Sequence, residues 1–149
     1  MSNQNNTSEQ ERNKATSLRF NDEVKNKHNF DAIDELLSAD FVNYSEIPGF
    51  PSTRAGVKAF FAYWVQAFPD LSCTINDVVA EGDRVVDYFT IEGTHQGEFL
   101  GIPATGRRVK YNGMHIFSYK DGKITGHWNV MDFLTQMIQL GVIPAPGQA

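Results

Sequence analysis

The strongest constraint on the fold is a wide apolar stripe in the middle of the chain. Thr53 precedes it as a possible N-cap, and Pro69 follows it as a helix breaker. A helix with this much aromatic surface needs a broad apolar partner, which a β-sheet provides. The stripe recurs at the spacing of one face of an α-helix and comprises Val57, Phe60, Phe61, Trp64, Val65 and Phe68.

The chain on either side of the stripe divides into helices before it and strands after it. We expect a disordered tail at residues 1–7, a helix over about 8–26, a second short helix after Asn29, and a short extended piece at 41–44. Strand-like runs cover 73–80, 84–93, 107–119 and 123–132, and a closing helix ends at Gly141. At the turn 120–122 we expect a type I hairpin with Gly122 as the left-handed bulge residue. This order predicts one α+β domain over residues 1–149, in which a curved sheet and the helices enclose a pocket.

Composition excludes several classes of function. The 149 residues are 41% hydrophobic and carry a net charge of −5 without a Lys/Arg cluster, so we expect no nucleic-acid partner. Cys73 is the single cysteine, which excludes an internal disulfide and a multi-cysteine metal site. No apolar run approaches the roughly 20 residues of a membrane span, and the polar start lacks a signal core. We therefore expect a cytoplasmic protein.

Several ordered blocks of sequence resemble one known family. They are AFPDL (67–71), VAEGDRVV (79–86), GTHQGEFLGIPATGR (93–107), DGKITGHWNVMD (121–132) and QLG (139–141). Together they resemble the SnoaL-like polyketide cyclases of the nuclear transport factor 2-like superfamily. The resemblance implies a cone-shaped α+β barrel, with N-terminal helices on the concave face of a curved antiparallel sheet. It also implies intramolecular aldol ring closure of a small-molecule substrate without metal or organic cofactor.

Within that resemblance, the acid/base aspartate corresponds to Asp132. Its neighbours Trp128, Val130, Met131 and Phe133 are apolar, and an apolar wall would raise the pKa of the carboxyl group toward neutrality. The alternative is that Asp132 caps the closing helix. The chain departs from the family at Tyr44, where the family often has histidine, and at Ser118 and Gly126, where it commonly has Arg and Glu.

Strand alternation gives a prediction for the pocket wall. Counting back from the turn, Asn112, Met114 and Trp128 share a face with Ile116, Ile124 and Asp132. We expect this more apolar set to line the pocket. The opposite face, which carries His115, Phe117 and His127, would then form the interface of a homodimer through the outer sheet face. A single bulge would reverse this assignment.

Five further residues could take part in the site, each with a structural alternative. Asn43 could bind a substrate oxygen or form a turn, and Tyr44 could donate to an enolate or only pack. Trp64 could reach the cavity with its indole N–H or belong to the core. His95 could donate from a loop or cap that loop. Asp87, in mid-strand, would compete for the acid/base role if it pointed inward, but we favour a solvated carboxylate.

His115 could assist Asp132 from within the pocket, although we favour the outer face of the sheet. His115 and His127 lack a third ligand, so we expect no metal site. The sequence thus predicts cofactor-free acid/base chemistry on a small, largely apolar carbonyl compound. The alternatives are a ketosteroid-isomerase-like or epoxide-hydrolase-like enzyme, or a non-catalytic, dimeric domain that binds a small ligand.

Overall fold

The structure is a computed structural model that describes residues 2–148, and the side chains of all of these except residues 2, 3 and 5. Its helices are α1 (Ser2–Phe20), the π-helical segment η1 (Asn21–Asn26), α2 (Ala32–Leu36), α3 (Arg54–Ala67) and α4 (Phe133–Leu140). Its strands are β1 (Leu37–Asn43), β2 (Ser72–Glu81), β3 (Arg84–Thr94), β4 (Arg108–Lys120) and β5 (Lys123–Met131).

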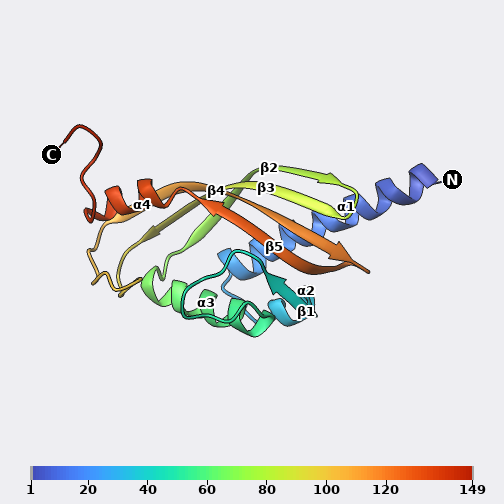
Figure 1. Cartoon of the computed structure of the whole chain (residues 1–149), viewed down its shortest axis with the longest axis horizontal. Coiled ribbons are helices and arrows are strands. Elements are labelled where there is room, and N and C mark those ends of the chain that lie inside the picture. Colours follow the sequence, from blue (N-terminus) through green and yellow to red (C-terminus); the bar gives the residue numbers. More distant parts are fainter. Residues whose placement is uncertain (1, 149) are drawn as a thin grey trace.

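The five strands form one sheet in the order β1-β5-β4-β3-β2. Strands β2 to β5 pair antiparallel, whereas β1 lies parallel to β5. The sheet arches over α3, and α1 passes along the same side (Figure 1). The predicted α+β fold with helices against a curved sheet is confirmed. The sheet is mixed rather than antiparallel, because the expected extended piece at 41–44 belongs to a longer strand that joins the edge of β5.

The N-terminal helix starts earlier than the sequence predicts. It begins at Ser2, so the expected disordered tail is helical over residues 2–7, and Met1 lies outside the described residues. This stretch contains neither proline nor glycine, so nothing in it prevents the helix from extending. The helix then widens into η1, whose buried residues are Asn21, Val24 and Lys25. Such π-helical turns often occur at functional sites.

The aromatic helix α3 forms as predicted. The Thr53 hydroxyl oxygen accepts a hydrogen bond from the Gly56 backbone N–H at 3.2 Å, and the helix ends at Ala67 before Pro69. Its stripe faces the sheet and buries Phe61 and Trp64 in the core. No helix within residues 2–148 is both long and apolar enough to cross a bilayer.

The β4–β5 hairpin differs from the prediction at its turn. Asp121 and Gly122 both have positive φ (52° and 78°), and Lys120 pairs with Lys123. This is a two-residue turn of the type favoured by Asp-Gly, rather than a type I turn with a bulge. A second irregularity lies where Tyr119 pairs with Ile124 and Ser118 with Gly126. Together they shift the register by two residues: Met114 pairs with Val130, whereas the predicted turn would pair it with Trp128.

Because the shift is an even number of residues, most side chains stay on the same face as their predicted neighbours. The face that turns toward the core is nevertheless the opposite of the predicted one. Tyr111, Phe117 and Tyr119 are buried on the inner side of β4, and His115 lies in the same row. Asn112 and Met114 alternate with them and are exposed. The predicted pocket wall is therefore wrong, because the row with three bulky aromatic rings fills the space against α1 and α3. Ile124 is buried, since the irregularity moves it to the inner row.

Candidate active site

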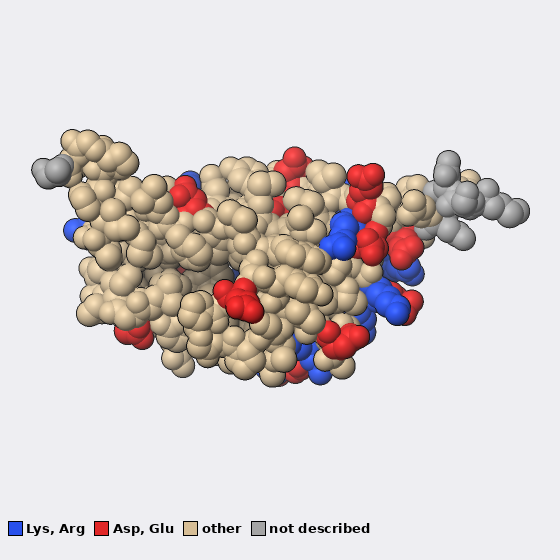
Figure 2. All heavy atoms as spheres, in the orientation of Figure 1, with Lys and Arg blue, Asp and Glu red and all other residues tan. Residues whose placement is uncertain are grey.

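A cavity of about 440 Å³ lies between the inner face of the sheet, α3, η1 and the loop that follows β1. Its size is typical of small-molecule sites. On one face of the molecule the charged side chains gather toward the N-terminal end, and the surface is hollowed near its middle beside an acidic side chain (Figure 2). Most of the wall is apolar, with the aromatic residues Phe20, Phe41, Phe60, Phe61, Trp64, Phe89, Phe99, Phe117 and Phe133.

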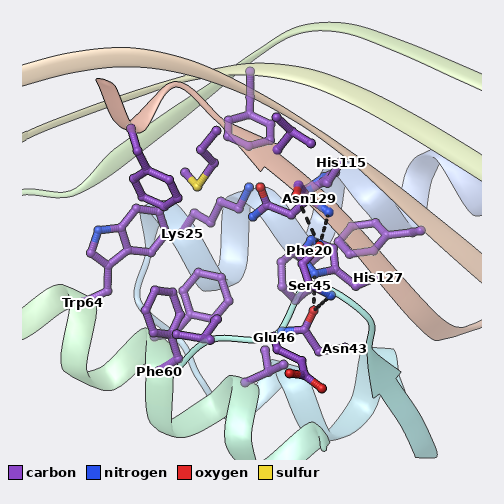
Figure 3. Close-up of a pocket in the computed structure, with 18 of the residues that line it drawn as sticks. Phe20, Lys25, Asn43, Ser45, Glu46, Phe60, Trp64, His115, His127 and Asn129 are labelled. Atoms are coloured by element: carbon purple, nitrogen blue, oxygen red, sulfur yellow. Dashed lines mark hydrogen bonds between the residues drawn. The ribbon is translucent and has the colours of Figure 1, made fainter. Parts of the chain in front are cut away.

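A small set of polar side chains faces this apolar space (Figure 3). They come from η1, β1 and its following loop, β4 and β5, which are distant in the sequence. Chemistry on a ligand in the cavity would have to use these groups, because the remaining wall offers few other polar atoms. They are Lys25, Asn43, Ser45, Glu46, His115, His127 and Asn129.

His115 is held by a carboxylate behind it. Asp87 on β3 pairs directly with His115 on β4, and the carboxylate Oδ2 lies 2.7 Å from Nε2. Both residues are buried, with relative exposures of 0% and 3%. Within residues 2–148 no hydrogen bond involves His115 Nδ1. The favoured prediction of a solvated, outward Asp87 is wrong, because the inner row of the sheet includes it.

Burial sets the protonation of this pair. It raises the pKa of Asp87 to about 6, against a smaller lowering by the charge of Lys25. Burial also holds the pKa of His115 well below its ordinary 6.5, and the charge of Lys25 adds to that effect. At neutral pH a neutral imidazole therefore donates its Nε2–H to an ionised carboxylate. The Nδ1 of the same ring then carries a lone pair that can accept a proton.

His127 lies beside His115 and is fixed by Asn43. The two imidazole centroids are 5.3 Å apart, and His127 Nδ1 is 3.1 Å from Asn43 Oδ1. The Ser45 backbone N–H donates to the same amide oxygen at 3.1 Å, which identifies that atom as an acceptor and His127 Nδ1 as a donor. Burial, with the nearby His115 and Lys25, holds the pKa of His127 well below 6.5.

The loop after β1 is tied to β5 at the same place. The Asn129 backbone N–H donates to the Ser45 hydroxyl at 2.6 Å, and this hydroxyl donates to the Asn129 carbonyl at 3.2 Å. These bonds fix the loop that carries Glu46, Ile47 and Pro48 against the strand that carries His127.

Trp64 lines the cavity and has a buried indole donor, Nε1, without a hydrogen-bond partner among the described residues. A buried N–H without a partner is costly, and a ligand oxygen could satisfy it. Trp64 and Asn43, which the sequence offers as candidate site residues, both line the cavity.

Asp132 is not in the cavity. It is exposed and caps α4, where its carboxylate accepts hydrogen bonds from the Thr135 backbone N–H at 3.1 Å and the Thr135 hydroxyl at 2.6 Å. These bonds lower the pKa of Asp132 below its ordinary value. The prediction that an apolar wall raises it is wrong, and the alternative as a helix cap is confirmed.

Four other predicted pocket residues lie on the outer face of the sheet. The Tyr44 and Trp128 rings stack at 4.6 Å, and the Arg84 guanidinium lies 4.7 Å from the Trp128 ring. Asn112 accepts a hydrogen bond from the Thr90 hydroxyl at 2.9 Å, and Met114 is exposed. Their placement in the pocket is wrong for the reason given above: the sheet turns its other side inward.

His95 is buried in a structural position outside the cavity wall. The Thr105 backbone N–H donates to its Nδ1 at 3.2 Å, and its ring stacks on Phe68 with centroids 5.2 Å apart. Burial lowers the pKa of His95. The loop 94–106 thus uses this histidine to hold its own backbone, which was the alternative interpretation.

Several pocket residues are not evident from the sequence. Nothing there marks Lys25 or Ser45 as site residues, and strand alternation places His115 and His127 on the outer face, whereas both line the cavity together with Asn129. The parity of His115 with Tyr111 and Tyr119 is the signal that could have placed it inward. Among residues 2–148, no three His, Cys, Asp or Glu side chains lie close enough together to hold a metal ion.

Comparison with known proteins gives the chain its family. The model of the SnoaL-like polyketide cyclases matches residues 15–140. The chain is 31% identical over 115 residues to nogalonic acid methyl ester cyclase of Streptomyces nogalater, covering 74% of this chain and 84% of that protein. It is 29% identical over 123 residues to aklanonic acid methyl ester cyclase DnrD of Streptomyces peucetius, covering 80% of this chain and 84% of that one.

A solved structure agrees with these sequence relatives. TsrD from Streptomyces laurentii superposes with a TM-score of 0.79 at 32% identity, covering 87% of this chain and 94% of that chain. The region matched by the family model, residues 15–140, includes the sheet and α3, which build the cavity of this chain. The chain belongs to the SnoaL-like polyketide cyclase family.

Proposed function

We propose that this protein closes a ring in a small, largely apolar carbonyl compound by cofactor-free acid/base catalysis, with His115 as the base and Asp87 as its positioning partner. The observation that carries the proposal is the 2.7 Å Asp87–His115 contact at the wall of an apolar cavity. At neutral pH the uncharged imidazole has a free lone pair, and the carboxylate behind it would stabilise the imidazolium that forms when it takes a proton.

The proposed reaction is an intramolecular aldol closure. His115 Nδ1 removes a proton from a carbon next to a carbonyl group, and the resulting enolate carbon attacks a second carbonyl in the same molecule. One carbon–carbon bond forms, and the new alkoxide takes the proton back from the imidazolium. The product is an isomer of the substrate, so the step needs no oxidant, reductant or co-substrate.

Two donors could stabilise the charge that develops on oxygen. Trp64 Nε1 has no partner among the described residues, and Asn43, whose oxygen is held by Ser45 and His127, lines the same cavity and has an amide nitrogen to donate. Preorganised donors of this kind are a major source of rate enhancement.

The names of the relatives suggest the substrates to test. Nogalonic acid methyl ester and aklanonic acid methyl ester would each be incubated with the protein and followed by liquid chromatography and mass spectrometry. The proposal expects a product of unchanged mass with a new retention time, formed in the presence of a chelator. No conversion of either compound, together with no exchange of their acidic C–H protons for solvent deuterium, would contradict it. Exchange without ring closure would instead indicate an isomerase-like proton shuttle.

We also propose that the protein forms a homodimer through the outer face of the sheet. That face exposes apolar side chains in neighbouring positions of three strands, Tyr88, Met114 and Val130, with exposures of 37%, 49% and 78%. Such a patch is typical of a protein–protein interface. The residues differ from the expected ones, because His115, Phe117 and His127 face inward. Sedimentation should give a dimer at micromolar concentration and a monomer for Met114→Lys; a monomeric wild type would contradict the proposal.

A further inference from the structure

Lys25 is a buried cation that has no ion-pair partner among the described residues. It projects from η1 into the cavity, and its residue is only 4% exposed (Figure 3). Its Nζ lies 4.0 Å from the centroid of the Phe89 ring and 3.9 Å from Cys73 Sγ. Within residues 2–148 it forms no salt bridge, whereas the surface residues Lys27 and Lys58 each have carboxylate partners.

This arrangement is energetically costly. A buried ammonium group loses its hydration, and neither an aromatic face nor a thiol replaces three hydrogen bonds to water. Buried charges in proteins are normally paired or bound to a ligand. The ammonium therefore has unused capacity to bind one negatively charged oxygen.

The groups around Lys25 do not supply that oxygen. His115 and His127 are neutral for the reasons given above. Asp87 carries the nearby negative charge, but its Oδ2 faces His115, its Oδ1 has no hydrogen-bond partner, and no salt bridge joins it to Lys25. Glu46 also lines the cavity, and it has no salt bridge to Lys25 among the described residues.

We infer that Lys25 forms an anion subsite in this cavity, so that the ligand is a mostly apolar molecule with one acidic oxygen, a carboxylate or an ionised enol. The apolar wall would hold the carbon skeleton, and Lys25 would orient it relative to His115 through its charged end. This specifies the chemical class of the proposed substrate and rests on the proposed function only in placing the substrate in this cavity.

The test compares two ligands that differ in charge. The dissociation constants of 2-naphthoate and its neutral analogue 2-naphthamide would be measured by calorimetry at pH 7.5, where the carboxylate is ionised. A charge-assisted hydrogen bond predicts at least ~10-fold tighter binding of the naphthoate to wild type. This ratio needs no variant, so it remains informative if a substitution at Lys25 impairs folding.

Variants assign the preference to one side chain. Lys25→Met retains the length of the side chain without the charge, and should reduce the naphthoate preference to about twofold or less while naphthamide affinity changes little. Lys120→Met removes an exposed positive charge at the hairpin and should leave the preference intact. Thermal unfolding would establish that both variants are folded.

Equal affinity of wild type for the two ligands, or no binding of naphthoate, would overturn the inference, as would an unchanged preference in folded Lys25→Met. Binding to His115→Gln separates this inference from the proposed function. That variant should retain the preference for naphthoate whether or not His115 is the base, so the anion subsite and the catalytic assignment can fail independently.

Discussion

Asp87 and His115 occupy directly opposed positions on β3 and β4, and their side chains meet at 2.7 Å in the interior of the sheet's concave side. The pair exists because the two strands keep one uninterrupted register over their shared length. The imidazole is thus positioned by backbone pairing and by one carboxylate, with its far side toward the cavity.

Replacing His115 by glutamine should lower turnover by roughly 10²–10⁴-fold, because the proposed base is lost while a polar side chain of similar reach remains. Ligand affinity should change much less than the rate. Steady-state kinetics on whichever methyl ester is converted provides the measurement. His95→Gln is the matched control, since it changes another buried histidine outside the cavity wall. Comparable losses of turnover in folded His115→Gln and folded His95→Gln would contradict the role of His115.

The rate constant of the reaction should decrease at acidic pH. Asp87 must be ionised to accept the Nε2–H of His115, and burial raises its pKa to about 6. Burial also holds the pKa of His115 well below its ordinary 6.5. The rate constant should therefore decrease as the pH falls through about 6. A rate independent of pH between about 5 and 8 would contradict this assignment.

The free energy of unfolding should also depend on the ionisation of Asp87. Ionisation should raise the rate but lower the stability. The folded-state pKa of Asp87 is raised above its ordinary 3.8, so its contribution to stability is present below about pH 4 and is lost as the pH rises through about 6. The loss amounts to roughly 2–3 kcal/mol. Urea unfolding of wild type and Asp87→Asn at several pH values measures it, because contributions from groups common to both proteins largely cancel. A difference that does not change between about pH 4 and 7 would contradict the buried carboxylate.

Trp64→Phe should weaken binding of a carbonyl ligand by about threefold to tenfold, because it removes one neutral donor while retaining an aromatic ring. Calorimetry with 2-naphthamide measures the effect. Trp128→Phe is the control, since that indole stacks on Tyr44 outside the cavity. Equal effects of the two substitutions, or none at Trp64, would show that the unpartnered indole N–H does not contact the ligand.

The order of helices and strands could be predicted from the sequence because local patterns determine it. The stripe on α3, its Thr53 cap and the end of α4 at Gly141 all depend on residues within a few positions of one another. The inward face of the sheet could not be predicted in this way. It depends on the total volume of each row. On β4 the row with His115 contains Tyr111, Phe117 and Tyr119, whereas the predicted row contains the smaller residues Asn112, Met114 and Ile116.

The site was harder to predict because its polar groups come from distant segments. Asp132 has apolar neighbours in the sequence, yet its position at the start of α4 leaves it exposed and hydrogen-bonded to Thr135. Lys25 lies on the buried side of η1, but a lysine in a polar stretch of sequence gives no local sign that it is buried. Only the assembled fold brings Lys25 and His115 to one cavity.

The most direct test of the account compares Asp87→Asn with Asp132→Asn in the same ring-closure assay. Asp87→Asn should reduce turnover by at least ~100-fold with the ligand still bound, because asparagine cannot support the imidazole as an ionised carboxylate does. Asp132→Asn should retain most of the activity and lose little stability, because asparagine caps a helix about as well as aspartate does. Full activity of Asp87→Asn, or loss of activity in folded Asp132→Asn alone, would contradict the assignment of the reaction to the Asp87–His115 pair.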